Sequence, residues 1–308
     1  MQNKKSIRML CSVAFLLIGI GAGTADGQIF VADFNNGVIG KYNLDGTPVN
    51  TSLISGLQGP YDLASDGNGH LFVLSRGLGG RGYVGEYNLD GSPVNVSLIS
   101  GLQSAQSMAL DGNGHIFIGQ NPLLGGYVSE FNLNGTPVNT SLITHIRPIC
   151  LEIDGNGHIF IADNNGNGVG GYVREYTTSG LVINPTLIGG LNNPIGLALD
   201  GDGHLFVANN TGGYIGEYTI SGETVNASLI SGLNNLGKIA LDGNGHLLVG
   251  NDPNGTPRVS EYSTGGTLVN NSFIAESGNP ISILVVPEPS VVGLVSVGLT
   301  IFYRRKRQ

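Results

Sequence analysis

The sequence predicts an all-β fold: a six-bladed β-propeller of four-stranded antiparallel blades, closed by a C-terminal strand that completes the first blade. Three observations lead to this fold class. The string Asp-Gly-Asn-Gly-His, or its variant Asp-Gly-Asp-Gly-His, occurs at Asp66–His70, Asp111–His115, Asp154–His158, Asp200–His204 and Asp242–His246. Successive copies start 45, 43, 46 and 42 residues apart, a spacing typical of repeated supersecondary units. Charged residues are only 12% of the chain and glycines number 51, which suits short strands joined by turns.

Each repeat is expected to hold four short antiparallel strands. In the unit spanning residues 194–235, the apolar runs are Pro194–Leu199, His204–Asn209, Tyr214–Thr219 and Thr224–Ile230. Each run is rich in β-branched or aromatic residues and is bounded by Gly, Asn, Asp or Pro, as strands are. Four strands in about 44 residues are typical of a propeller blade.

Six such units are predicted. The second strands are expected to begin at Ile29, His70, His115, His158, His204 and His246. The third strands are expected at Val38–Leu44, Tyr83–Leu89, Tyr127–Leu133, Tyr172–Thr178, Tyr214–Ile220 and Arg258–Thr264. The first unit lacks a first strand, and an unassigned run, Pro280–Val286, follows the last unit. We therefore expect Pro280–Val286 to complete the first blade, which removes two open strand edges.

The repeat resembles the NHL-type propeller repeat. The shared pattern is Pro-x-Gly-φ-Ala-φ-Asp followed by a φ-φ-Val-Ala-Asp/Asn strand, and Pro194–Asn209 and Ile29–Asp33 match it best. The resemblance spans residues 28–286 and implies the fold. Many functions share this fold, so the resemblance assigns no activity.

The N-terminus is typical of a secretory signal peptide. Lys4, Lys5 and Arg8 precede an apolar run, Met9–Ile20, and small residues ending at Ala25 supply a cleavage site. The predicted signal peptide is therefore residues 1–25, the propeller is residues 26–286, and export follows the Sec pathway.

The last 22 residues contain a second three-part signal. Pro287, Glu288 and Pro289 precede an apolar run, Val291–Tyr303, and a basic cluster at 304–307. A run of 13 residues falls short of the roughly 20 that span a bilayer comfortably, although an ordinary short membrane tail remains an alternative. The pattern over residues 287–308 resembles the PEP-CTERM sorting signal of Gram-negative bacteria. That resemblance implies transient membrane anchoring, processing by an exosortase-type enzyme, and a cell-surface or extracellular location in a bacterium that makes extracellular polysaccharide.

Charge and cysteine content exclude some function classes. Residues 26–287 contain seven Lys and Arg against 21 Asp and Glu, a net charge of −14. Such a surface repels nucleic acid and anionic lipid. After signal removal only Cys150 remains, so no intramolecular disulfide forms. A monomer is expected.

The repeated polar residues are interpreted as structural. Asp-Gly-Asn-Gly is a turn sequence, and it lacks the further acidic residues of a calcium-binding EF-hand loop. The turn histidines are expected one blade apart, too far from one another to share a metal ion. Val-Asn-x-Ser recurs on the predicted fourth strand, where polar residues discourage edge pairing. Its asparagines are Asn50, Asn95, Asn139, Asn226 and Asn270.

Positions that differ between the repeats are the better candidates for function. On the innermost strands, period-2 alternation is expected to point one set of side chains into the channel and the other into the packed core. The channel set is Asp62, Ser107, Cys150, Gly196, Lys238 and Ser282, with Ala64, Ala109, Glu152, Ala198, Ala240 and Leu284. The packing set is Leu63, Met108, Leu151, Leu197, Ile239 and Ile283. The candidate ligand-binding residues of the channel are therefore Asp62, Cys150, Glu152 and Lys238.

The loops at the channel mouth carry a second candidate group. Its members are Tyr61, Arg76, Arg81, His145, Arg147 and Arg258. Arginine forks suit carboxylates, so an anionic or sugar ligand is one hypothesis. The other is that the charged groups only neutralise one another in a wet channel. No cofactor is expected, although Asp62 and Glu152 could hold a divalent cation such as calcium.

Two classes of function remain open. The first is a non-catalytic surface or matrix protein that binds polysaccharide or surface proteins and is associated with exopolysaccharide or biofilm. The alternative is a metal-dependent enzyme resembling propeller lactonases and lyases, in which Asn193, Asn235 or His145 would join the two carboxylates. Cys150 has no definable base partner, which argues against a thiol nucleophile.

Overall fold

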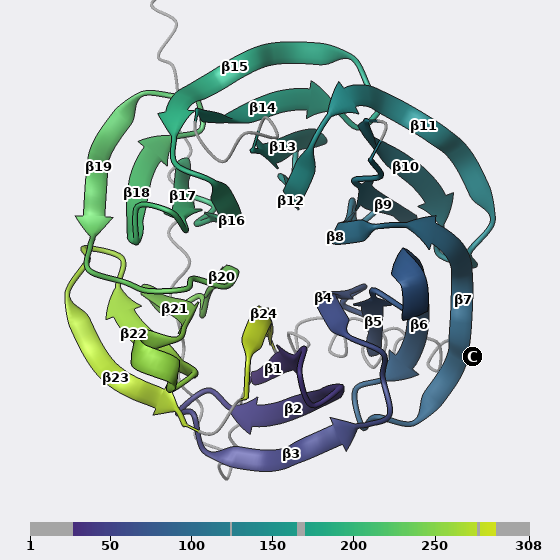
Figure 1. Ribbon diagram of the computed structural model, residues 1–308, viewed down its shortest axis with the longest axis horizontal. Coiled ribbons are helices and arrows are strands. Elements are labelled where there is room, and N and C mark those ends of the chain that lie inside the picture. The colour runs from purple at the N-terminus through teal and green to yellow at the C-terminus, as the bar shows by residue number, and fades with distance from the viewer. Residues whose placement is uncertain (1–26, 124, 165–169, 276–277, 288–308) are drawn as a thin grey trace, which may run out of the picture.

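A computed structural model describes residues 27–123, 125–164, 170–275 and 278–287 of the chain. Six four-stranded antiparallel sheets form a ring around a central channel (Figure 1). The predicted fold class is confirmed. In the described ranges the only helices are two 3₁₀ turns, η1 (Leu78–Gly80) and η2 (Pro253–Gly255), and neither has the length or apolar character to cross a membrane. The predicted signal peptide and almost all of the predicted sorting signal lie outside the described residues.

Each blade is formed by strands that run in order from the channel outward. The first blade holds β24 (Pro280–Val286), β1 (Gln28–Asp33), β2 (Val38–Asn43) and β3 (Pro48–Ile54). The second holds β4 (Pro60–Ser65), β5 (His70–Ser75), β6 (Arg81–Asn88) and β7 (Pro93–Gln103). The third holds β8 (Ala105–Leu110), β9 (His115–Gln120), β10 (Gly126–Asn132) and β11 (Pro137–Ile146).

The remaining three blades repeat this order. The fourth holds β12 (Pro148–Ile153), β13 (His158–Asp163), β14 (Gly171–Thr177) and β15 (Val182–Leu191). The fifth holds β16 (Pro194–Leu199), β17 (His204–Asn209), β18 (Tyr214–Thr219) and β19 (Thr224–Ile230). The sixth holds β20 (Ile239–Leu241), β21 (His246–Asn251), β22 (Arg258–Ser263) and β23 (Leu268–Ile274). The predicted second and third strands match within a residue or two at nearly every end.

The ring closes as the sequence predicts. β24 pairs antiparallel with β1, from Val286 opposite Gln28 to Ser282 opposite Ala32. The first blade is therefore assembled from the two ends of the described chain, and its inner edge is covered.

The core consists of six apolar clusters, one between each pair of neighbouring blades. Leu63 belongs to the cluster shared with the first blade, whereas Ala64, the next residue on β4, belongs to the cluster shared with the third. Each sheet presents the edge of its innermost strand to the channel, so alternate side chains of that strand point toward the two neighbouring blades. The prediction that only one set faces the channel is therefore wrong: Leu63 and Asp62 line the same channel cavity.

The repeated turn string has the structural role expected of it. The Asp66 carboxylate accepts hydrogen bonds from the backbone N–H groups of Asn68 (2.8 Å) and His70 (3.1 Å), and the other turns repeat these contacts. Asp and Asn stabilise turns in this way because their side chains replace a backbone acceptor.

The Asn-x-Ser pattern, replaced by Asn-Pro-Thr in the fourth blade, builds a bulge in each outer strand. Asn50 Oδ1 accepts a hydrogen bond from the Ser52 backbone N–H at 3.0 Å, and the same bond occurs in all six outer strands. At each bulge the register between the third and fourth strands shifts. A bulge of this kind disrupts an open edge and so limits edge-to-edge pairing.

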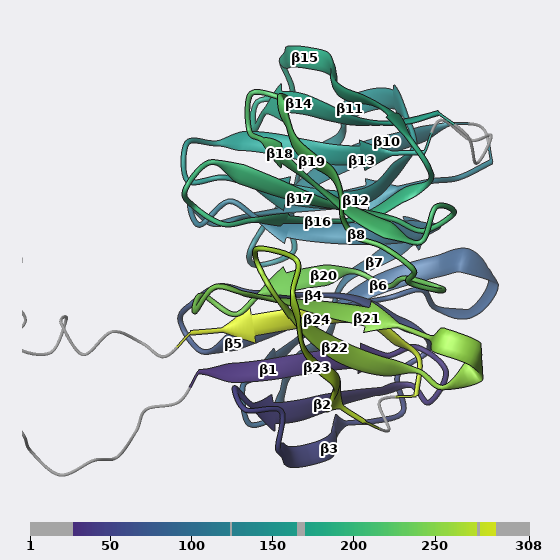
Figure 2. The same cartoon turned by 90° about the vertical axis from the view of Figure 1, so that its left-hand side faces the viewer.

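The disc has two distinct faces. The Asp-Gly-Asn-Gly-His turns lie on one of them, which we call the turn face. The connections from second to third strands and from each outer strand to the next blade lie on the other, which we call the mouth face. Because Gln28 pairs with Val286, β1 begins and β24 ends at the turn face, on the left of Figure 2.

Candidate functional site

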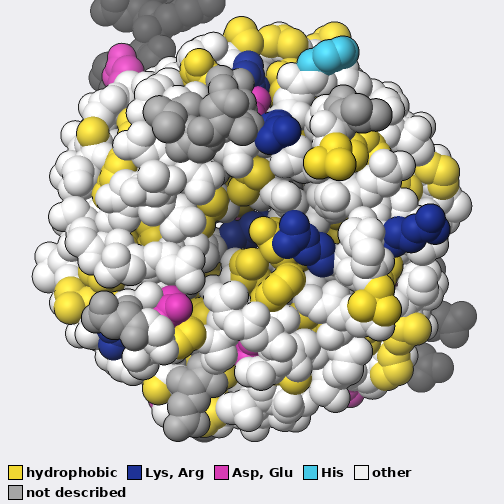
Figure 3. All heavy atoms as spheres, in the orientation of Figure 1, with side chains coloured by type: hydrophobic (Ala, Val, Ile, Leu, Met, Phe, Trp, Pro, Cys, Tyr) yellow, Lys and Arg dark blue, Asp and Glu magenta, His cyan; other side chains and the backbone are white. Residues whose placement is uncertain are grey.

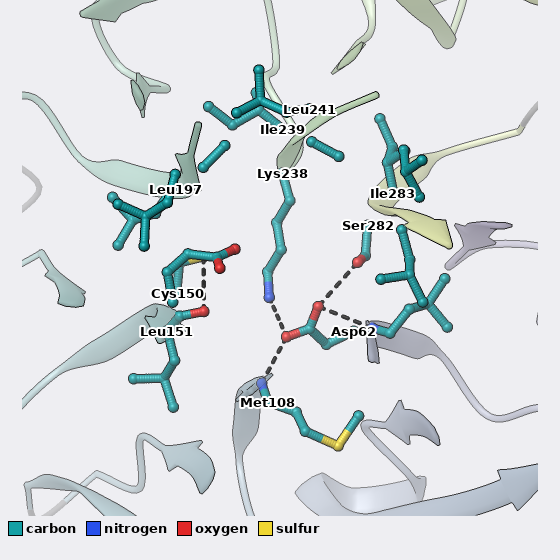
Figure 4. Close-up of a pocket in the computed structure, with 17 residues that line it drawn as sticks. Asp62, Met108, Cys150, Leu151, Leu197, Lys238, Ile239, Leu241, Ser282 and Ile283 are labelled. Carbon is teal, nitrogen blue, oxygen red and sulfur yellow. Dashed lines mark hydrogen bonds and ion pairs between the residues drawn. The ribbon is translucent and has the colours of Figure 1, made fainter. Parts of the chain in front are cut away.

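A buried ion pair crosses the channel. The Lys238 ammonium contacts Asp62 Oδ2, and both side chains are almost wholly enclosed. Asp62 also accepts hydrogen bonds from the Met108 N–H (2.7 Å), the Leu63 N–H (3.0 Å) and the Ser282 hydroxyl (3.0 Å), as Figure 4 shows. Strands of four blades thus meet at one carboxylate. Burial opposes the charge on Lys238, but Asp62 outweighs it, and the pKa of Lys238 is raised.

A cavity of about 240 Å³ lies on the turn-face side of this ion pair. Glu152 and Cys150 reach it, and eight of its 17 lining residues are leucine or isoleucine. Burial, together with the charge of Asp62, raises the pKa of Glu152 to about 8 against the opposing effect of Lys238. Burial likewise raises the pKa of the Cys150 thiol to about 12. At neutral pH both groups are therefore largely protonated.

A second hollow, of about 200 Å³, opens on the mouth face and shares Lys238 with the first. Its lining includes four aliphatic residues and three asparagines: Tyr61, Ile149, Ile195, Asn210, Asn235, Leu236, Gly237, Lys238, Asn279 and Ile281. We call it the mouth cup. The Arg76 guanidinium lies 5.2 Å from the centre of the Tyr61 ring, and Phe34 meets the same ring edge-on at 5.9 Å. The Asp62–Lys238 pair thus separates the mouth cup from the cavity on the turn-face side.

The structure brings together some of the predicted site residues and separates others. Asp62, Cys150, Glu152 and Lys238 line one cavity, and Tyr61 joins Lys238 in the mouth cup. Arg81 instead lines a separate surface hollow with Tyr127.

The remaining predicted residues line neither hollow in the described part of the chain. His145 is exposed and contacts Thr144 Oγ1 (2.9 Å), and the Arg147 backbone N–H donates to Asp163. Arg258 buries its Nε atom without a partner among the described residues. The arginines therefore lie at separate points on this side of the ring. Figure 3 shows Lys and Arg side chains near the channel opening and elsewhere on this face, with few Asp or Glu among them.

The predicted metal pair, Asp62 and Glu152, does not fit a metal site. Both oxygens of Asp62 already accept hydrogen bonds, and Lys238 occupies the place of a cation. The raised pKa of Glu152 leaves that carboxyl protonated at neutral pH, when it is a poor metal ligand. The Cys150 thiol contacts the Leu151 carbonyl at 4.0 Å, and no hydrogen bond joins it to a basic side chain among the described residues.

Sequence reasoning missed two groups of residues. The first is most of the amide and apolar lining of the mouth cup, of which only Tyr61 and Asn235 were predicted. Part of it could have been found from the residue directly after the proline position of a repeat, which gives Ile149, Ile195, Gly237 and Ile281 as well as Tyr61. The second is a pair of glutamates, Glu175 and Glu261, that approach turn histidines across neighbouring strands. The sequence feature that could have revealed them is a Glu at the same position in five of the six third strands.

Comparison with known proteins supports the fold alone. No family model matches the sequence, and no curated protein matches it. A chain in the crystal structure of a nidogen/laminin complex superimposes with a TM-score of 0.68 at 15% identity, covering 84% of this chain and 98% of that one. A functionally unknown protein from Desulfotomaculum acetoxidans superimposes with a TM-score of 0.60 at 16% identity, covering 87% of this chain and 88% of that one. Both likenesses agree with the propeller architecture.

Proposed function

We propose that this protein is an exported, non-catalytic binding protein that presents its mouth face to an acidic polysaccharide at the cell surface. The observation that carries the proposal is the placement of the chain ends. Gln28 and Val286 lie together on the turn face, opposite the mouth cup. A tail that resembles a sorting signal and follows Val286 would therefore tether the disc with its mouth face directed outward.

The chemistry of the mouth face supports binding rather than catalysis. The mouth cup combines apolar walls and an aromatic ring with three asparagine side chains, groups that suit sugar rings and their hydroxyls. The charged groups of the channel neutralise each other, and the channel thiol stays protonated. The alternative enzyme would need converging metal ligands in the channel, and Asp62 is already committed to Lys238.

The charge distribution supports an anionic ligand. Residues 26–287 carry a net charge of −14, yet four of their seven basic residues lie in or beside mouth-face loops. These are Arg76, Arg81, Arg147 and Arg258. Attraction between such arginines and carboxylates is weakened by salt, because exposed charges are screened beyond about 10 Å at 0.1 M ionic strength.

A protein partner is the second candidate. The propeller of similar fold in the nidogen/laminin complex was crystallised with a protein partner, which favours this candidate in the present chain. Association with exopolysaccharide or biofilm is the finer part of the proposal, and it depends on the resemblance of the tail to a sorting signal.

The ligand is tested by binding of the purified full chain to alginate, a uronic-acid polymer, with uncharged dextran as the comparison. We expect binding to alginate alone and a roughly tenfold loss, about 1.4 kcal/mol, in the Arg76→Ala/Arg81→Ala double variant. Lys41→Ala is the matched control, because Lys41 donates to the Leu89 carbonyl near the turn face. Equal binding to both polymers, or an equal loss in the control, would contradict the proposal.

The location is tested separately in the producing bacterium. Mass spectrometry of surface-washed protein is expected to find an N-terminus after Ala25 and loss of residues beyond Pro289. Recovery of the intact chain from the cytoplasm would refute export without bearing on the alginate result.

A further inference from the structure

Two turn histidines each lie between two carboxylates. His246 Nδ1 is 2.9 Å from Asp242 Oδ2 and 3.3 Å from Glu261 Oε1. In the fourth blade, His158 Nδ1 is 3.1 Å from Glu175 Oε1 and 3.6 Å from Asp154 Oδ2. One ligand atom from each of Asp242, His246 and Glu261 lies within 4.8 Å of the others.

The repeat itself assembles these clusters. In the sixth blade, β21 pairs with β22 so that Leu248 lies opposite Glu261, and His246 is two residues before Leu248 on the same side of the sheet. The turn aspartate is held in place because Asp242 Oδ1 accepts the Asn244 and His246 backbone N–H groups, at 2.7 and 2.9 Å. Its second oxygen is thereby fixed against the imidazole ring.

Each cluster is short of positive charge. Glu175 and Glu261 are 8% and 9% exposed, and within the described residues only the histidine contacts either carboxylate. Each imidazole is also shared with an aspartate, so two carboxylates face at most one positive charge. Burying a carboxylate is costly unless a cation compensates its charge.

We propose that Asp242, His246 and Glu261 bind one divalent transition-metal ion, with Zn²⁺ as the representative, because theirs is the described group whose three ligand atoms all lie within 4.8 Å of one another. An imidazole nitrogen with two carboxylate oxygens is a ligand set that zinc accepts, and the imidazole disfavours calcium and magnesium. Bonds of about 2.0–2.1 Å in a tetrahedral shell place ligand atoms about 3.3 Å apart. His246 Nδ1 lies 2.9 Å from Asp242 Oδ2 and 3.3 Å from Glu261 Oε1, close to this value. The His246 imidazole is about one-third exposed, which leaves room for water as a further ligand.

The other blades supply internal comparisons. In the second, third and fifth blades the imidazole forms an ion pair with the turn aspartate alone, at 2.7–2.9 Å. Glu86, which lies opposite Phe72 just as Glu261 lies opposite Leu248, makes no ion pair with His70 among the described residues. In the first blade the corresponding residue is Lys41, opposite Phe30, and the turn string is missing. The proposed site therefore differs from the second, third and fifth blades by the approach of one glutamate. In the fourth blade Glu175 also approaches His158, but the three ligand atoms there do not all lie within 4.8 Å of one another.

The test is equilibrium dialysis of the untagged full chain against Zn²⁺, with bound metal measured by elemental analysis. We expect one bound ion per chain. Glu261→Gln is expected to remove it, while the matched controls Glu175→Gln and Glu86→Gln leave it bound. Glutamine keeps the size of the side chain and removes its charge, so thermal melting without metal should show that each variant is folded.

A second measurement does not depend on any variant. Zn²⁺ should raise the melting temperature of the wild-type chain, because a ligand that binds only the folded state stabilises it by RT ln(1 + [L]/Kd), and Ca²⁺ at the same concentration should not. Absence of bound Zn²⁺ and of any shift in melting temperature would overturn the proposal. So would unchanged zinc content in the folded Glu261→Gln variant. Neither result depends on whether the mouth face binds alginate.

Discussion

Replacing Glu152 with glutamine is expected to stabilise the propeller, and the gain should depend on pH. The folded-state pKa of this carboxyl is about 8, against 4.5 for an ordinary glutamate. Between these values the folded protein holds a proton that the unfolded chain releases, so the stability of the wild type falls as pH rises from about 4.5 to about 8. Glutamine does not titrate and avoids this loss.

The size of the effect follows from the difference in pKa. Each pKa unit corresponds to about 1.36 kcal/mol, so the full difference is at most about 5 kcal/mol above pH 8 and about 3 kcal/mol at pH 7. Glu152 is partly accessible, but it reaches a channel cavity of about 240 Å³ rather than the outer surface of the disc. Its charge is therefore poorly hydrated, although relaxation of the cavity would reduce these figures.

Urea unfolding at pH 5.0, 7.0 and 8.5 measures the prediction. The difference in unfolding free energy between Glu152→Gln and wild type should be small at pH 5.0 and grow to a few kcal/mol at pH 8.5. Glu223→Gln, on the exposed turn before β19, is the control and should show no such trend. A difference that is the same at all three pH values would refute the assigned pKa and the enclosure of Glu152.

Three further predictions concern stability and are each checked by thermal or urea unfolding. Lys238→Met leaves the buried Asp62 carboxylate uncompensated and should lower the free energy of unfolding by about 3–5 kcal/mol. Adding Asp62→Asn should restore most of that loss, and a double variant whose loss equals the sum of the two single losses would contradict the ion pair. Deleting residues 280–308 exposes the edge of β1 and removes the buried Ile283 and Val286. The melting temperature should therefore fall by about 10 °C. Deletion of 288–308 is the control and should leave it unchanged. His145→Gly should raise the free energy of unfolding by about 1 kcal/mol, because His145 has a φ of 62° where other blades have glycine. A lower free energy of unfolding would instead show that the His145 ring makes stabilising contacts.

The repeat explains why so much of the fold was predictable. Each blade carries its own turn string, so the starts of β5, β9, β13, β17 and β21 could be read from the histidine that follows each turn. The closing strand was predictable because its proline and alternating apolar residues match β16. Both signals are local, since they depend on turn geometry and strand periodicity.

The candidate site was less predictable for a geometric reason. Asp62 and Lys238 were recognised as unusual because they break the repeat, but their contact joins the second and sixth blades across 176 positions of sequence. The alternation of β4 was misread because a propeller presents its sheets edge-on to the channel. No local pattern distinguishes a side chain that faces a channel from one that faces a neighbouring blade.

The sequence by itself determined the number of blades, the order of strands within them and the closure by Pro280–Val286, because a repeated pattern of turns and apolar runs specifies each blade almost independently. Only the tertiary structure decided that Lys238 neutralises Asp62, that Glu152 is enclosed, and that Glu175 and Glu261 approach histidines while Glu86 does not. These contacts depend on how blades and strands face one another in three dimensions. Charge compensation and burial depend on distances between residues that are far apart in the sequence, so only the closed ring determines them.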